Sequence, residues 1–247
     1  MLPSDVHAYL SELAARLRAV LDGDLLGLYV GGSVALGAYQ HGRSDVDVVA
    51  VSRGALGLAD KQAIVSSLRH ESLPCPARGL ELVVYAEKTV GEPSAEPGFE
   101  LELNTGARMP FHAAFDPSGA SGRHWYVLDR AILARHGVTL VGPQPPALVA
   151  DVPRELVLPA LVESVRWFAA HDAPGSDAVL NACRALRYAA DGRWSSKAEA
   201  GRWALEQLDD GELIAQALRA RESREPLDAA RTKPFLERAA SELVGAA

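Results

Sequence analysis

The chain has 247 residues, of which 48% are hydrophobic and 23% charged, and its formal net charge at pH 7 is −7. This is enough apolar material for one large or two modest domains whose cores need no disulfide or metal. The acidic balance disfavours a nucleic-acid partner, which prefers a basic face, and suits a cationic small-molecule substrate.

The cellular setting is predicted from the cysteines and from the N-terminal segment. Cys75 and Cys183 lie far apart in the sequence and lack metal-ligand spacing, so we expect a reducing, cytoplasmic location. The N-terminal residues carry acids early and lack the basic and then apolar pattern of a secretory signal. No apolar stretch approaches the ~20 residues of a membrane span, so we expect no membrane association.

Hydrophobic periodicity predicts an alternation of helices and strands in the first part of the chain. Helices are predicted at 5–22, 58–71 and 123–136, and strands at 25–30, 45–51, 80–86, 99–104 and 138–141. Four prolines then mark residues 143–153 as a linker. Later segments have helical periodicity, at 154–171, 177–191, 197–208, 211–222 and 233–244. The sequence therefore predicts a mixed α/β domain over 1–150 and an all-α helical bundle over 151–247.

Two aspartates on one predicted strand are the first candidate functional residues. Asp45 and Asp47 are two residues apart, so both carboxylates point to one face while Val46 and Val48 point to the other, buried face. Carboxylates together with phosphate oxygens are the ligands that Mg²⁺ prefers. A pair of solvated acids at a strand start is the alternative interpretation.

A third acid and a glycine turn strengthen the functional interpretation. Glu81 opens the next apolar strand, where an unpaired charge is costly, and a helix between the two strands allows them to be neighbours. The turn at Gly31, Gly32 and Ser33 follows the first strand and allows close approach of a phosphate to the backbone. Convergence of the three acids beside this turn would suit metal-assisted phosphoryl or nucleotidyl transfer.

The run GGSVALGAYQHGRSDVDVVAV at 31–51 resembles the signature of the polymerase-β-like nucleotidyltransferase superfamily. More closely, the chain resembles the aminoglycoside adenylyltransferases that modify streptomycin and spectinomycin. The resemblance extends over RGLELVVY at 78–85, HGVTLVGP at 136–143 and LNACRALRYAADGRWSSKAEAGRWAL at 180–205.

The resemblance implies a set of roles. Asp45 and Asp47 match magnesium ligands, and Glu81 matches the catalytic base beside the same metal. The residues matching positions that bind the nucleotide are Gly32, Ser33, Ser44, Arg184 and Lys197. The implied reaction uses ATP as co-substrate, with Mg²⁺, in a cleft between the two domains. Without the resemblance, both basic residues would be read as ordinary helix surface.

The acceptor is the least defined part of the prediction. Residues 102–117 lack the tryptophan of the family's streptomycin-binding enzymes, which predicts a differently shaped pocket. Glu100, Glu102 and Asn104 share a strand face that either receives a cationic acceptor or is solvated. The mixed charges of 219–231 predict a solvated surface. Alternative functions are a nucleotidyltransferase acting on protein or RNA, and a non-catalytic nucleotide sensor.

Overall fold

A computed structural model describes residues 2–170, 175–223 and 226–246. The chain divides into two compact units, one formed by 1–121 with 129–152 and the other by 122–128 with 153–247. The first is α/β and the second is helical, which confirms the expected fold class. The predicted boundary at residue 150 stays a prediction, and residues 122–128 group with the helical unit.

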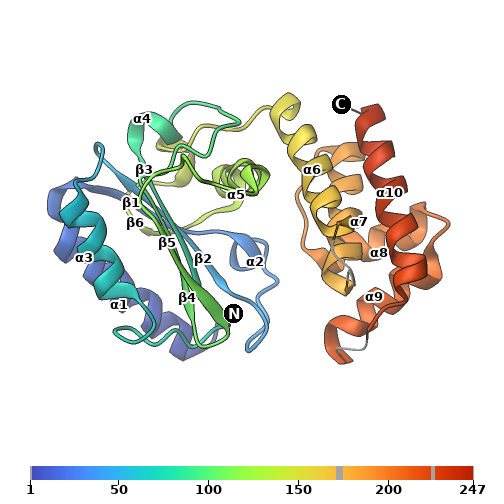
Figure 1. Ribbon diagram of the computed structural model, residues 1–247, viewed down its shortest axis with the longest axis horizontal. Coiled ribbons are helices and arrows are strands. Elements are labelled where there is room, and N and C mark those ends of the chain that lie inside the picture. Colours follow the sequence, from blue (N-terminus) through green and yellow to red (C-terminus); the bar gives the residue numbers. More distant parts are fainter. Residues whose placement is uncertain (1, 171–174, 224–225, 247) are drawn as a thin grey trace. The chain divides into compact units, whose positions relative to one another are not determined.

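The α/β unit contains one mixed sheet of six strands in the order β5-β4-β3-β2-β1-β6 (Figure 1). Strands β2 and β3 are parallel, and all other neighbours are antiparallel. The strands are β1 (Leu25–Val30), β2 (Val46–Ser52), β3 (Leu80–Ala86), β4 (Leu101–Gly106), β5 (Met109–Ala114) and β6 (Val138–Val141). The helices are α1 (Ser4–Leu21), α2 (Gly32–Ala35), α3 (Leu58–Leu68), α4 (Glu87–Val90) and α5 (Arg123–His136), with short 3-10 turns at Asp22–Asp24 and Pro145–Ala147.

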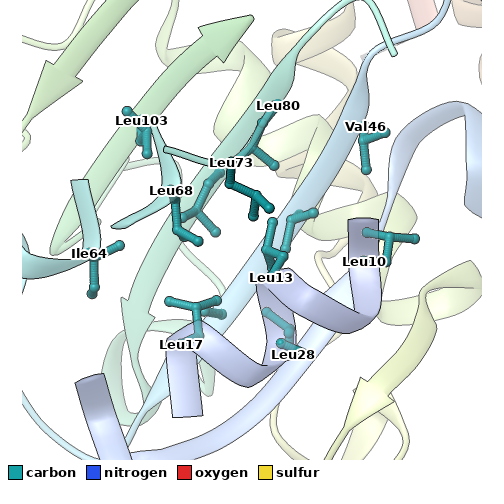
Figure 2. Close-up of a cluster of buried hydrophobic side chains, with 14 of the residues drawn as sticks. Leu10, Leu13, Leu17, Leu28, Val46, Ile64, Leu68, Leu73, Leu80 and Leu103 are labelled. Carbon is teal, nitrogen blue, oxygen red and sulfur yellow. The ribbon is translucent and has the colours of Figure 1, made fainter. Parts of the chain in front are cut away.

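One face of the sheet is closed by α1 and α3 over a large apolar core (Figure 2). Leu10, Leu13 and Leu17 of α1 recur at helical spacing and lie against Leu28 of β1 and Leu80 of β3. All five side chains are buried. This packing fixes which face of each strand is apolar, and therefore which face is left for polar groups.

Because side chains alternate between the two faces along β2 and β3, this packing also decides where the acids point. Val46 and Val48 of β2 are buried in the core, as are Leu80 and Leu82 of β3. The residues between them, such as Asp47, point to the opposite face. The predicted orientation of Val46 and Val48 is therefore confirmed.

The helical unit contains α6 (Arg154–Ala169), α7 (Ser176–Asp191), α8 (Lys197–Gln207), α9 (Gly211–Ser223) and α10 (Ala229–Ala246). Helix α8 begins with a capping box in which Ser196 Oγ accepts from the Glu199 N–H at 3.2 Å and Glu199 accepts from the Ser196 N–H at 2.9 Å. Among the helices that the structure describes, none is long and apolar enough to cross a lipid bilayer.

Strand β5 was not predicted from the sequence. It carries Pro110 and is half exposed at the edge of the sheet, pairing only with β4. Proline is tolerated on an edge strand because one side of the strand makes no ladder hydrogen bonds. A proline within a weakly apolar segment predicts a turn or loop rather than a strand, which explains why β5 was not predicted.

Candidate active site

The register of the sheet brings polar side chains of three strands into one row. Asp47 of β2 is the direct partner of Glu81 of β3, which is in turn the partner of Asn104 of β4. Directly paired residues have side chains on the same face. Asp47 and Glu81, which the sequence placed on separate strands, are therefore neighbours. Asn104 adjoins them on the face of β4 for which the sequence left a cationic acceptor and solvent as alternatives.

The turn after β1 holds the Asp47 carboxylate against the backbone. Gly32 has a φ of +50°, and a Cβ at this position would lie 1.8 Å from Asp47 Oδ2. The Ser33 backbone N–H donates to the same carboxylate. Only glycine allows this approach, because any side chain at residue 32 would displace the acid. One of the backbone N–H groups that were predicted to face a phosphate, that of Ser33, therefore donates to Asp47 instead.

The two predicted phosphate-binding serines differ in how their hydroxyls are engaged. Ser33 Oγ is buried and has no hydrogen-bond partner among the described residues. An orphaned buried hydroxyl indicates a ligand or solvent contact, because such groups are costly when unsatisfied. Ser44 Oγ instead accepts from the Gln40 N–H at 3.0 Å and stabilises the turn before β2.

Arg78, which the sequence analysis did not single out, lies among the acids. Its guanidinium donates to Asp45 Oδ2 and lies 3.3 Å from Glu81 Oε1. The arginine thus connects the first aspartate with the glutamate. Its signal in the sequence is its position three residues before Glu81, just ahead of the strand that carries this acid.

Burial and repulsion between the acids shift the pKa of two of them. Burial, followed by repulsion from Asp45, raises the pKa of both Asp47 and Glu81 well above their ordinary values. Asp129 of α5 adds to this repulsion, although it is exposed and was not predicted. The Glu81 side chain remains 40% exposed, so it is accessible to a ligand.

The donor set fits a hard divalent cation in its chemistry. Asp45, Asp47 and Glu81 offer only carboxylate oxygens, which Mg²⁺ favours. As the side chains lie, no three histidine, cysteine or acidic groups within 2–170, 175–223 and 226–246 are arranged to hold a metal ion. Arg78 contacts two of the three acids, so the donor set suits the ion only after this guanidinium moves.

A second charged cluster lies within the helical unit. Asp177 of α7 accepts from Lys197 Nζ of α8 and from Arg221 Nη1 of α9, both at 3.0 Å. The side chains of Lys197 and Arg221 are only 29% and 10% exposed. Burial lowers the pKa of Lys197, and the positive charges of Arg184 and Arg221 lower it further, against the opposing effect of Asp177.

Arg184 is fixed beside this cluster by a chain of buried polar groups. Its Nη2 donates to Asn181 Oδ1 at 2.9 Å, and Asn181 Nδ2 donates to Ser164 Oγ at 3.2 Å. Asn181 and Ser164 are both buried. Three cations and one acid therefore lie close together, an excess of positive charge suited to a phosphate group.

The solvated-surface prediction for 219–231 is wrong at Arg221, because that side chain turns into the helix packing. It holds for Arg219 and Arg231, which are exposed, while Arg224 and Glu225 lie outside the described residues. The alternation of charges along the sequence gave no signal for Arg221, since its partner Asp177 is 44 positions away.

The chain therefore combines a mixed sheet that carries paired carboxylates with a separate helical unit. The fold is similar to a crystal structure of the spectinomycin adenyltransferase AAD(9) from Enterococcus faecialis with ATP and spectinomycin. The TM-score is 0.71 and the identity 17%, covering 97% of this chain and 99% of the other. A toxin–antitoxin structure with AMP-PNP aligns at a TM-score of only 0.30 and 13% identity, covering 64% and 90% of the two chains.

Residues 147–245 match the family described as aminoglycoside adenylyltransferase, C-terminal domain. No curated protein matches the sequence. The C-terminal part of the chain is thus similar to aminoglycoside adenylyltransferases in sequence, and the whole chain is similar to AAD(9) in fold.

Proposed function

We propose that the chain moves AMP from ATP to a hydroxyl group of a small, cationic, aminoglycoside-like acceptor. The observation that carries the proposal is the pairing of Asp47 with Glu81 on the polar face of the sheet, with Asp45 connected to Glu81 through Arg78. The match of residues 147–245 to the C-terminal domain of aminoglycoside adenylyltransferases supports the same class of reaction. The ATP and spectinomycin of the AAD(9) structure belong to that protein and suggest which ligands to test here.

The carboxylates of Asp45 and Asp47 are proposed to hold Mg²⁺ with the nucleotide phosphates. The ion, when bound, neutralises the charge that develops on the transferring phosphoryl group. Asp47 is oriented for this role by its contacts with Gly32 and the Ser33 N–H. The orphaned Ser33 hydroxyl supports a phosphate contact at the same turn.

Glu81 is proposed as the general base. It takes the proton of the acceptor hydroxyl, whose oxygen then attacks the α-phosphorus and releases pyrophosphate. A pKa raised above the ordinary value brings a glutamate closer to the range in which it can accept a proton effectively near neutral pH. The exposure of its side chain leaves room for the hydroxyl.

Phosphate binding is proposed to involve Gly32, Ser33 and Ser44 in the α/β unit and Arg184 and Lys197 in the helical unit. For Ser44 the contribution is to shape the turn, because its hydroxyl is engaged by Gln40. Lys197 and Arg184 are supported by the excess positive charge around Asp177.

The acceptor is proposed to lie beyond Glu81 on the face of β4. Asn104 is the cross-strand partner of Glu81 and donates to Glu102 Oε1 at 3.2 Å. Glu102 has an 18% exposed side chain and lies 3.6 Å from His112 Nε2. An acidic and an amide group next to the base suit the ammonium and hydroxyl groups of such a molecule.

The test is a panel of aminoglycosides and aminocyclitols, including spectinomycin and streptomycin, incubated with MgATP and scored for pyrophosphate release. Glu81→Gln is expected to retain ATP binding and to lower transfer about 10²- to 10⁴-fold, the contribution typical of a general base. Glu87→Gln makes the same chemical change at an exposed position just after β3 and should have no effect. Labelling of protein or RNA instead of the panel would replace the proposed acceptor, and an active Glu81→Gln would remove Glu81 from the base role.

A further inference from the structure

Arg78 lies where the negative charge of the sheet face is greatest. Its guanidinium contacts Asp45 and Glu81, and Asp47 contributes to the negative field around it. One cationic side chain therefore faces three acids. These are the acids to which the proposed function assigns cation binding and proton transfer.

The backbone of Arg78 is fixed, whereas its head group can move. The Arg78 N–H donates to Ser44 O at 3.0 Å, and the Val46 N–H donates to Gly79 O at 2.9 Å, which joins the starts of β2 and β3. The Arg78 side chain is 44% exposed, so its head group can exchange the acids for water without disturbing the sheet. A guanidinium does not lose its proton in proteins, so its charge leaves the acids only by movement.

We propose that Arg78 is the internal counter-ion of this site, neutralising Asp45 and Glu81 in the absence of a divalent cation and giving up Asp45 when a cation binds. The inference rests on the proposed function, because it takes the carboxylates as the cation site. Arg78 and the ion compete for the same oxygen atoms of Asp45. The arginine acts through the acids, so it is a positioning residue.

This competition predicts an order of binding. A bare cation must displace the guanidinium without compensation, so its affinity is lowered. A cation that arrives with a nucleotide also brings phosphate oxygens, to which the displaced guanidinium can donate instead. The presence of Arg78 therefore favours the ion that is already bound to a nucleotide over the free ion.

The experiment uses Mn²⁺ as the probe, because free Mn²⁺ is quantified by electron paramagnetic resonance. The full chain is titrated without nucleotide as wild type, Arg78→Ala and Arg78→Lys. Arg78→Ala is expected to bind Mn²⁺ roughly three- to tenfold more tightly, as one competing charge at a partly exposed site is removed. Arg78→Lys keeps the charge but loses the planar fork, and should lie between the two.

Arg69→Ala is the matched control, because Arg69 is similarly exposed and pairs with Glu71 at 2.8 Å. It should leave Mn²⁺ affinity unchanged. A second measurement is thermal unfolding, in which metal-free Arg78→Ala should melt at a lower temperature than the wild type and gain more from added Mn²⁺. If Arg78→Ala does not fold, Arg78→Gln replaces it, with the same tightening expected.

The outcomes separate this inference from the proposed function. Equal Mn²⁺ affinities for folded wild type and folded Arg78→Ala would overturn the counter-ion role and leave the proposed function standing. Absence of Mn²⁺ binding in the wild type and all variants, with or without ATP, would overturn the carboxylate site and the counter-ion role together.

Discussion

The two charged clusters of the chain are built in opposite ways. In the α/β unit, Asp47 and Glu81 are neighbours because they are paired residues of adjacent strands. In the helical unit, Asp177, Lys197 and Arg221 come from three different helices and meet only through packing. The first cluster has an excess of negative charge and the second an excess of positive charge. The difference shows that strand register brings the acidic cluster together, whereas helix packing brings the basic cluster together.

The largest expected loss of activity comes from moving Asp47 away from the turn after β1. A Cβ at residue 32 would overlap the Asp47 carboxylate, so Gly32→Ala must displace it. Displacement of a catalytic group by about 1 Å can lower turnover on the order of 100-fold. We expect a loss of that size in steady-state adenylyl transfer.

The matched control for this prediction is Gly37→Ala. Gly37 also has a positive φ, of +64°, but a Cβ there would meet nothing within 4 Å. The two variants share backbone strain and differ in the contact with the acid. Equal losses of turnover would show that strain, and not the position of Asp47, is responsible.

A smaller effect tests the cluster that depends on packing. If Lys197 and Arg221 both contact phosphate, Lys197→Ala and Arg221→Ala should each raise the KM for ATP about tenfold, the effect of losing one charged hydrogen bond. Arg219→Ala removes an exposed arginine of the same helix as Arg221 and should change nothing. An Arg221→Ala chain that behaves like Arg219→Ala would restrict the anion site to the residues that the family resemblance identified.

The smallest effect concerns the stability of the metal-free chain. The pKa of Asp47 is raised on folding, so its contribution to stability is complete below its ordinary pKa and is lost as pH rises through the raised value. Asp47→Asn removes the charge, and should raise the melting temperature at pH 7 by about 2–4 °C, for about 1 kcal/mol in a chain of this length. The difference should vanish near pH 4.

Calorimetry of Asp116→Asn provides the comparison for Asp47→Asn. The pKa of Asp116 is lowered by its hydrogen bonds with Ser118, so neutralising this exposed acid should not stabilise the chain. A gain in stability for both variants would point to the overall charge of −7 as the cause, and would contradict a local origin in the acid cluster.

The sequence was most informative where the position of a side chain follows from the two-residue period of a strand. Asp45, Asp47 and Glu81 were predicted to converge because residues on a strand alternate between faces. The register pairs Asp47 with Glu81, and Asp45 is connected to Glu81 through Arg78. Arg78 and Arg221 were not found, because their contacts depend on the side-chain direction of one residue and on the packing of distant helices. Periodicity predicts faces, and it carries no information on which side chains meet across a tertiary contact.

The register of β2 against β3 depends on the buried residues on either side of the acids. Val46, Val48, Leu80 and Leu82 are all buried, so sliding β3 by one residue would move its leucines to the face that bears the acids and Glu81 into the apolar core. The connection between the two strands can therefore change in length without moving Asp47 relative to Glu81, because buried apolar side chains, and not the loop, set the alignment of the two acids. Selection for a stable hydrophobic interior thereby also preserves the alignment of Asp47 with Glu81.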